Sequence, residues 1–123
     1  MSLNILAVDD SRTIRDMLNL TMNQAGFTTH LAEDGVQGVE VLKEMSPAPD
    51  AIITDINMPR MDGFEFIVAV RKIEEFRAIP ILVLTTESAP ELKQRARDAG
   101  ATGWIVKPFQ PKKLIRALQM VTG

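Results

Sequence analysis

The sequence predicts an α/β fold, in which a doubly wound, five-stranded parallel β-sheet carries helices on both faces. Short apolar segments that are typical of buried strands alternate five times with longer segments whose apolar residues recur at helical spacing. Such alternation indicates a parallel sheet built from right-handed crossovers. The 123 residues suffice for one domain with one core, and a hydrophobic content of 46% with 24% charged residues suits a globular protein.

Five short segments are expected to form the strands. They are residues 4–8, 27–31, 51–54, 81–84 and 103–106. Gly26 ends the helix before the second segment, and Pro80 directly precedes the fourth. Segments of four or five apolar residues are too short for helices, so the strand interpretation is favoured.

The helices are predicted from apolar periodicity and from capping residues. Ser11 is a candidate N-cap for the first helix, which ends at Gly26. Asp34, with Gln37 three residues later, resembles a capping box for the second helix, which continues to Ser46–Pro47. A loop rich in proline and glycine, residues 58–63, leads into the third helix. Pro111 opens the fifth helix, whose inward residues are Leu114, Ile115, Leu118 and Val121.

The fourth helix has an unusual composition. Ser88 and Glu91 resemble a capping box, and Pro90 lies in the first turn. Leu92 is the only large apolar residue before Gly100. Because such a helix buries little apolar area, we expect it to be the least firmly held element of the fold.

The composition also excludes several classes of function. The chain has no cysteine, which rules out disulfides, thiolate catalysis and cysteine–zinc sites. A net charge of −2 gives no reason to expect a nucleic-acid partner or an anionic membrane surface. No apolar segment approaches the roughly 18 residues that a membrane span needs, and the N-terminus does not resemble a signal peptide. A cytoplasmic location is therefore expected.

Polar residues follow the predicted strands at the points where they end. Asp9 and Asp10 follow the first strand, Asp55 follows the third, Thr85 the fourth and Lys107 the fifth. The carboxyl ends of parallel strands meet at one edge of the sheet, where open α/β folds bind their ligands. A single aspartate at a strand end is often only a cap or a solvated charge, but this set of residues at one edge favours a functional site.

These residues together predict chemistry on phosphoryl groups. Asp9, Asp10 and Asp55 would converge if the first and third strands are neighbours, and three adjacent carboxylates repel one another unless a divalent cation binds. Ligand sets made only of oxygen favour Mg²⁺ or Mn²⁺. Asp55 is the expected nucleophile, Lys107 supplies a positive charge and Thr85 a hydroxyl donor, as in phosphoryl transfer.

The same residues resemble the receiver domain of two-component response regulators. The resemblance covers essentially the whole chain and depends on Asp9–Asp10, residues 55–63 (DINMPRMDG), Thr85 and Lys107–Pro108. It implies the flavodoxin-like strand order 2-1-3-4-5 and a histidine kinase that phosphorylates Asp55. It also implies that the Lys107–Pro108 peptide bond is cis.

The resemblance further implies a ligand set for Mg²⁺. Asp10, Asp55 and the backbone carbonyl of Asn57 would bind the ion, and Asp9 would lie in its outer shell. Thr85 would turn toward the phosphoryl group. This movement is expected to open space beneath Trp104, whose indole would turn inward and reshape the surface of the fourth helix, fifth strand and fifth helix. The alternative is that Trp104 is an ordinary aromatic residue of an edge strand.

Within this family, the chain resembles the single-domain chemotaxis regulators of the CheY type. We expect one receiver domain, residues 1–123, with no output domain, and Asn57 and Glu87 also match the CheY type. The expected protein is a monomer that assists only its own phosphorylation and dephosphorylation and is not otherwise an enzyme. Expected partners are a histidine kinase, the flagellar motor switch protein or another protein target, and a phosphatase. A phosphate sink or a phosphorelay intermediate is the alternative role.

Two rival functions use related residues. A Mg²⁺-dependent phosphatase of the haloacid dehalogenase type needs a second aspartate two positions after its nucleophile, where this chain has Ser11 and Arg12. A flavodoxin-like flavin binder must hold a phosphate in its first loop, where Asp9–Asp10 would repel it. Both rivals are disfavoured for these reasons.

Overall fold

A computed structural model of the chain describes residues 2–123, and Met1 of the expected domain lies outside the described residues. The described residues form one parallel sheet in the order β2-β1-β3-β4-β5, which confirms the predicted fold and strand order. The strands are β1 (Asn4–Val8), β2 (Thr28–Ala32), β3 (Ala51–Thr54), β4 (Ile81–Thr85) and β5 (Gly103–Val106). The helices are α1 (Arg12–Gln24), α2 (Gly35–Glu44), α3 (Gly63–Lys72), α4 (Pro90–Ala99) and α5 (Pro111–Thr122), with a short 3₁₀ helix, η1 (Glu74–Phe76).

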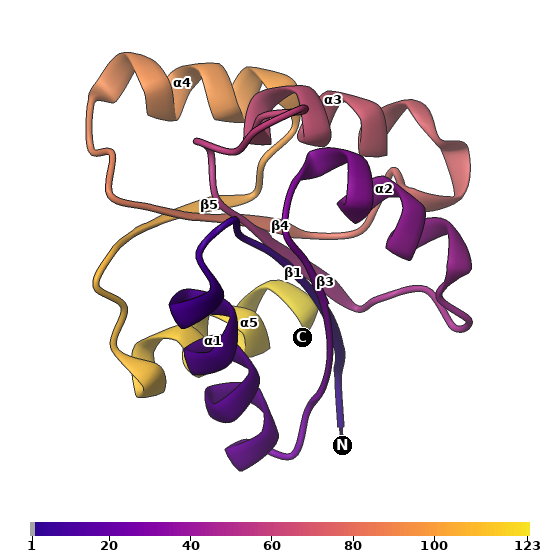
Figure 1. Cartoon of the computed structure of the whole chain (residues 1–123), viewed down its shortest axis with the longest axis vertical. Coiled ribbons are helices and arrows are strands. Elements are labelled where there is room, and N and C mark those ends of the chain that lie inside the picture. The colour runs from indigo at the N-terminus through magenta and orange to yellow at the C-terminus, as the bar shows by residue number, and fades with distance from the viewer. Residues whose placement is uncertain (1) are drawn as a thin grey trace.

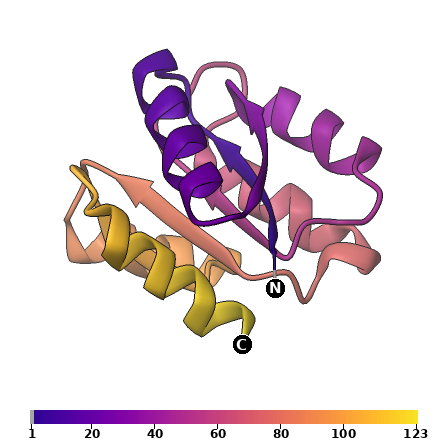
Figure 2. The same cartoon turned by 90° about the horizontal axis from the view of Figure 1, so that it is seen from below.

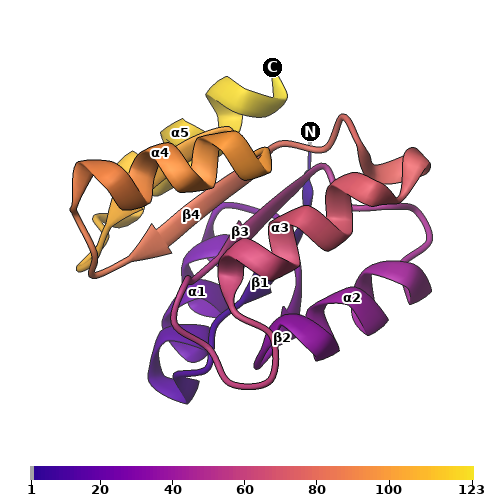
Figure 3. The ribbon, with the colours of Figure 1, turned by 90° about the horizontal axis from the view of Figure 1, so that it is seen from above.

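The helices form two layers, one on each face of the sheet. Helices α2, α3 and α4 cover one face, while α1 and α5 cover the other (Figure 1). Figure 2 looks onto the layer of α1 and α5, and Figure 3 onto the layer of α2, α3 and α4. Alternate residues of the strands supply the two cores, because successive side chains point to opposite faces. Leu6, Ile52 and Val83 pack under α2, α3 and α4, whereas Ile5, Ile53 and Leu84 pack under α1 and α5.

The strand register brings the predicted site residues to one edge of the sheet. Val8 pairs with Thr54 in neighbouring strands, so the residues that follow them, Asp9 and Asp55, leave the sheet side by side. Thr85 is the last residue of β4 and pairs with Val106 of β5. Lys107 therefore begins beside Thr85, and its backbone amide donates a hydrogen bond of 2.8 Å to the Thr85 carbonyl.

Three of the five strands have the predicted bounds, and two differ by one residue. Strand β4 includes Thr85, and β2 covers Thr28–Ala32 where residues 27–31 were expected. The shift in β2 has a local cause. The Phe27 amide donates to the Met22 carbonyl at the end of α1, so pairing with the sheet begins at Thr28, whose amide donates to Leu3.

The helix caps confirm most of the predicted helix starts. The Ser11 hydroxyl accepts the Ile14 amide at the start of α1, and the Asp34 carboxylate accepts the Gln37 amide at the start of α2. The reciprocal hydrogen bond of the predicted capping box differs by one residue. The Gln37 side chain accepts the Glu33 amide and not the amide of the N-cap residue Asp34.

The predicted Ser88 cap of α4 is wrong. The helix begins at Pro90, its N-cap is Ala89, and no side chain caps it. Ala89 is extended, with φ −64° and ψ 131°. A residue before proline is held out of the helical region by a clash with the proline ring, so Ala89 cannot form the first turn and the start moves past Ser88.

Helix α4 buries little, as expected, but a polar contact anchors its C-terminal end. Ala96 is its only buried residue in the described structure. The guanidinium of Arg71, in α3, donates to the Gly100 carbonyl just beyond α4 at 3.0 and 2.8 Å. It also donates to the carbonyls of Phe76 and Arg77, both at 3.1 Å. The apolar periodicity of α4 could not predict these hydrogen bonds, because the donor, Arg71, lies in α3.

Among residues 2–123, none of the helices is long and apolar enough to cross a membrane.

Candidate functional site

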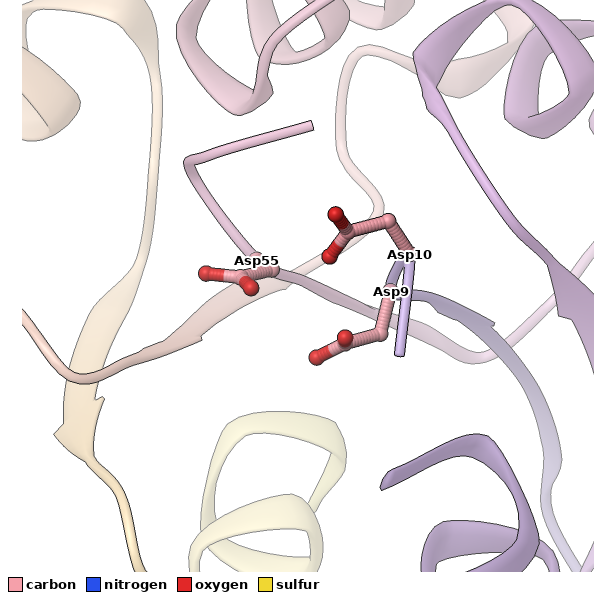
Figure 4. Close-up of side chains that lie close together, drawn as sticks. All are labelled: Asp9, Asp10 and Asp55. Atoms are coloured by element: carbon pink, nitrogen blue, oxygen red, sulfur yellow. The ribbon is translucent and has the colours of Figure 1, made fainter. Parts of the chain in front are cut away.

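The structure brings the three predicted carboxylates together beyond the ends of β1 and β3. Each of Asp9, Asp10 and Asp55 offers a carboxylate oxygen, and these oxygens lie within 4.8 Å of one another (Figure 4). Asp9 and Asp55 are buried, with exposed fractions of 1% and 8%, whereas Asp10 is exposed. The cluster therefore has two fixed inner carboxylates and one at the solvent boundary.

Lys107 is the cation of this cluster. Its Nζ lies 2.7 Å from Asp9 Oδ2 and 3.1 Å from Asp55 Oδ2, so a single ammonium bridges both buried carboxylates. Burial raises the pKa of Asp9, although the hydrogen bond from Lys107 acts against this shift. Burial alone would lower the pKa of Lys107, but the hydrogen bond to Asp9 and the negative charges of Asp55 and Asp9 raise it. Lys107 thus stays charged at neutral pH.

Backbone amides fix the orientation of the two buried carboxylates. Asp9 Oδ1 accepts the Ser11 amide at 2.9 Å, and Asp55 Oδ1 accepts the Ile56 amide at 2.7 Å. The Arg15 guanidinium, one turn into α1, donates to the Asp9 carbonyl at 2.8 Å. The sequence gives no sign of this contact from Arg15, because a long side chain that reaches a main-chain carbonyl leaves no spacing pattern.

The donor set fits a hard divalent cation. The cluster offers carboxylate oxygens from Asp9, Asp10 and Asp55, without histidine or cysteine, which is the chemistry that Mg²⁺ and Mn²⁺ prefer. One ammonium faces three carboxylates, so the ionised cluster keeps two negative charges. Among residues 2–123, no cationic side chain forms an ion pair with Asp10. A divalent cation beside Asp10 would balance this surplus charge.

Thr85 lies fully buried at the end of β4, next to Lys107. Its hydroxyl oxygen accepts the Glu87 amide at 3.3 Å. A hydroxyl that accepts one hydrogen bond still has its own hydrogen to donate. Thr85 can therefore act as the hydroxyl donor that was predicted from the sequence. The Lys107–Pro108 peptide bond is cis, as expected, and Ser46–Pro47 is a second cis bond that was not predicted.

Two contacts through Glu87 join Trp104 to Asn57, which lies two residues after Asp55 in the chain. The Asn57 side-chain amide lies 3.4 Å from Glu87 Oε1, and the Trp104 indole donates to the Glu87 carbonyl at 2.9 Å. Trp104 is half-buried and packs against the core under α3 and α4. The structure therefore places Trp104 outside the carboxylate cluster, with Glu87 between the two.

The loop after Asp55 is shaped by Gly63. The Gly63 amide donates to the Ile56 carbonyl at 2.8 Å, and a Cβ atom at this position would lie 2.2 Å from the Asp55 carbonyl oxygen. Only glycine allows α3 to start this close to the strand end. Asp62 and Glu65 form a reciprocal capping box at that start, which the sequence analysis did not predict.

The geometry suits acceptance of a phosphoryl group by a carboxylate. Asp55 is fixed by an amide and an ammonium, and Lys107 is placed to offset charge on an incoming phosphoryl group. Thr85 offers a hydroxyl at the end of β4, and its main chain lies beside that of Lys107. Asp9 is also buried and in contact with the lysine, but its side chain is 1% exposed, whereas that of Asp55 is 10% exposed and so is open to solvent.

Comparison with known proteins gives concordant results. Residues 5–119 match the response regulator receiver domain family. The chain is 38% identical over 122 residues to the chemotaxis protein CheY1 of Helicobacter pylori, with 98% of each chain covered. It is 36% identical to the sensor histidine kinase CheAY of H. pylori but spans only 14% of its length. It spans half the length of the response regulator MprA of Mycobacterium ulcerans, at 37% identity.

Solved structures agree with this result. The chemotaxis protein CheY4 of Vibrio cholerae superimposes with a TM-score of 0.92 at 45% identity, covering 98% of this chain and 99% of that one. The receiver domain of the sensor histidine kinase PA1611 of Pseudomonas aeruginosa superimposes with a TM-score of 0.90 at 28% identity, covering 100% and 99%. The latter structure has a magnesium ion coordinated in its active-site cleft.

Proposed function

This chain belongs to the response regulator receiver domain family, and on that premise we propose that Asp55 accepts a phosphoryl group from a histidine kinase. The chain is thus a receiver domain of two-component signalling. The observation that carries the assignment of Asp55 is the Lys107 ammonium, which bridges Asp55 to Asp9 at 3.1 and 2.7 Å. Of the two carboxylates that contact the ammonium, Asp55 is the more exposed, with 10% of its side chain accessible against 1% for Asp9, which supports Asp55 as the acceptor.

The transfer step follows from this arrangement. A carboxylate oxygen of Asp55 attacks the phosphorus of a phosphohistidine, a P–O bond forms and the P–N bond breaks. The imidazole nitrogen leaves with the electron pair and takes a proton from solvent. Lys107 offsets negative charge on the phosphoryl oxygens. In a separate step, water attacks the phosphorus of the acyl phosphate, and the P–O bond to Asp55 breaks. Inorganic phosphate is released and the Asp55 carboxylate is restored.

The transfer depends on Mg²⁺, with Mn²⁺ as a substitute. Asp10, Asp55 and the Asn57 carbonyl would hold the ion, and Asp9 would lie in its outer shell. When bound, the cation neutralises charge on the carboxylates and on the phosphoryl oxygens. The excess of carboxylates over ammonium groups supports this set, as does the magnesium ion in the PA1611 receiver domain.

The output is a change of surface that a target protein reads. Thr85 donates its hydroxyl hydrogen to the phosphoryl group. Because the Thr85 hydroxyl oxygen also accepts the Glu87 amide, this movement changes the conformation of the loop that carries Glu87. Because the Glu87 carbonyl accepts the Trp104 indole hydrogen bond, the loop and the indole move together. The chemotaxis relatives CheY1 and CheY4 support a target in chemotaxis, such as the flagellar motor switch protein, with a phosphatase as a further partner.

One experiment tests the acceptor. The protein is incubated with Mg²⁺ and a small phosphodonor such as acetyl phosphate, and the acyl phosphate is trapped with hydroxylamine and mapped. Wild type and Asp16→Asn, an exposed control in α1, should label alike, whereas Asp55→Asn should not. Equal labelling of Asp55→Asn and wild type would refute the assignment.

A second experiment separates the two possible roles. Beryllofluoride, a phosphoryl mimic, is added with Mg²⁺ while Trp104 emission and binding of a motor-switch peptide are followed. Binding that rises with the emission change supports a chemotaxis output. Occupancy of Asp55 by beryllofluoride without peptide binding would instead support a phosphate sink or relay, as would return of the phosphoryl group to a histidine kinase in a parallel assay with the phosphorylated protein.

A further inference from the structure

The loop between β3 and α3 contains a strained turn. The Met61 amide donates to the Pro59 carbonyl at 2.7 Å, which makes a γ-turn with Arg60 at its centre. Arg60 has a φ of 66° and is the only residue other than glycine with positive φ in the described structure. Such a conformation persists only where surrounding contacts hold it, and it often marks a functional segment.

The Arg60 side chain is held by a buried carboxylate from another loop. Its Nε lies 2.9 Å from Asp34 Oδ2, and its Nη2 lies 3.1 Å from Asp34 Oδ1. The Asp34 side chain is 5% exposed and that of Arg60 is 56% exposed. Burial acts to raise the pKa of Asp34, but hydrogen bonds from Arg60 and the Gln37 amide outweigh it and lower the pKa. A bidentate pair of this kind fixes orientation as well as distance.

A second contact joins the same two loops. The Gly35 amide donates to the Met61 carbonyl at 3.1 Å. A Cβ atom on Gly35 would lie 2.6 Å from the Met61 carbonyl oxygen, so only glycine permits this approach. Asp34 and Gly35 together hold Arg60 and Met61, one through a side chain and the other through the main chain.

The other end of the loop is also fixed. The Gly63 amide donates to the Ile56 carbonyl at 2.8 Å, and the Ile56 amide donates to Asp55 Oδ1. Asn57 lies between these fixed points. Its own side chain reaches only Glu87, at 3.4 Å, and Asn57 is exposed. The Arg60–Asp34 pair is thus the strong polar contact that limits movement of the segment carrying Asn57.

We infer that Arg60 and Asp34 are positioning residues that hold the Asn57 main chain in the conformation needed to bind a divalent cation. This inference rests on the proposed function, because the Asn57 carbonyl is one of the proposed ligands. A loop ordered before the cation arrives does not have to be ordered on binding, so the pair raises cation affinity without touching the ion.

Three variants test the inference through Mg²⁺ affinity, measured by calorimetry and by amide chemical shifts in the whole 123-residue chain. Arg60→Gln and Asp34→Asn both break the ion pair and keep the strained turn. Asparagine is also a good N-cap, so α2 retains its start. Arg60→Gly breaks the pair but relieves the positive φ. Each should weaken Mg²⁺ binding by about tenfold, which is the lower end of the loss that is typical when a contact behind the metal ligands is removed.

Arg60→Gly gives the sharpest readout. Both Arg60→Gly and Arg60→Gln lose the ion pair, but only glycine relieves the backbone strain, so Arg60→Gly should have a higher urea midpoint than Arg60→Gln and yet bind Mg²⁺ no more tightly. Its Met61 and Gly35 amides should also exchange hydrogen faster without any cation. A residue that served stability alone would not separate these measurements. Arg97→Gln, which removes an exposed arginine from α4, is the matched control and should bind as wild type does.

The outcomes are distinct. If wild type binds no Mg²⁺, the proposed function fails and the inference fails with it. If wild type binds Mg²⁺ and all three variants bind it equally well, the inference alone is overturned. Should Arg60→Gln fail to fold, Arg60→Gly and Asp34→Asn still decide the result.

Discussion

Removing the charge of Asp10 should stabilise the protein in the absence of divalent cations. Its carboxylate lies with those of Asp9 and Asp55, all within 4.8 Å of one another, and Lys107 pairs only with the other two. Asp10→Asn keeps the shape of the side chain and removes one of the three negative charges. The folded state therefore loses a repulsion that the unfolded chain does not have.

The magnitude follows from this separation. Two unit charges 4.8 Å apart repel by about 0.9 kcal/mol in water and by about 3.5 kcal/mol at an effective dielectric constant of 20. Asp10 is exposed, so the lower value applies to each pair, and the attraction of Lys107 offsets part of the sum. We expect Asp10→Asn to raise the free energy of unfolding by about 1 kcal/mol.

Magnesium should cancel this advantage. A ligand at a hundred times its Kd stabilises the folded protein by about 2.7 kcal/mol, and by about 1.4 kcal/mol if its affinity is tenfold weaker. Wild type should thus gain about 1.3 kcal/mol more than Asp10→Asn from the same Mg²⁺ concentration, which removes the difference between them.

The assay is urea unfolding at pH 7, followed by Trp104 fluorescence and by circular dichroism, with EDTA or with Mg²⁺. Glu75→Gln, an exposed residue of η1, is the matched control for loss of one negative charge. If Asp10→Asn is no more stable than wild type in EDTA, the repulsion argument is wrong. If it gains as much stability from Mg²⁺ as wild type does, Asp10 does not help to hold the cation.

Three further predictions follow from single contacts. Gly63→Ala should lower the free energy of unfolding by about 1–3 kcal/mol, because its Cβ would overlap the Asp55 carbonyl oxygen, and unchanged urea midpoints would contradict this. Thr85→Val should leave occupancy by beryllofluoride intact and abolish the Trp104 emission change, and an emission change equal to wild type would exclude Thr85 from the switch. The lowered pKa of Asp34 stabilises the fold at pH values above its ordinary pKa, and this stability is lost as pH falls through the lowered value. Arg60→Gln should raise the pKa of Asp34 and reduce that acid-dependent loss, which carboxyl NMR titration and urea unfolding between pH 5 and 2 would measure.

Apolar patterning accounts for what the sequence predicted well. Strands β1, β3 and β5 match their expected bounds, because each is a short apolar segment between polar or glycine residues. The convergence of Asp9, Asp55 and Lys107 follows from parallel strands that end at one edge, so topology and strand ends were sufficient to find the cluster.

Local backbone restrictions and contacts between residues far apart in the chain account for most of what was missed. The start of β2 moved because the Phe27 amide bonds to α1, and the start of α4 moved because Pro90 restricts Ala89. Arg60 was not recognised because its partner Asp34 is 26 residues away and was assigned only a capping role. Hydrophobic periodicity and local propensity do not predict a hydrogen bond between a long side chain and a loop that is distant in the sequence.

Arg71 anchors only the C-terminal end of α4, so the helix can rotate about that end. Its C-terminal end is held where the guanidinium donates twice to the Gly100 carbonyl, while its N-terminal end at Ala89 has no side-chain cap. A helix of ten residues is about 15 Å long, so its two ends can move by very different amounts when it rotates about one of them. If α4 rotates slightly about the Gly100 end, Pro90, five residues after Thr85, moves furthest and the residues near Gly100 hardly move.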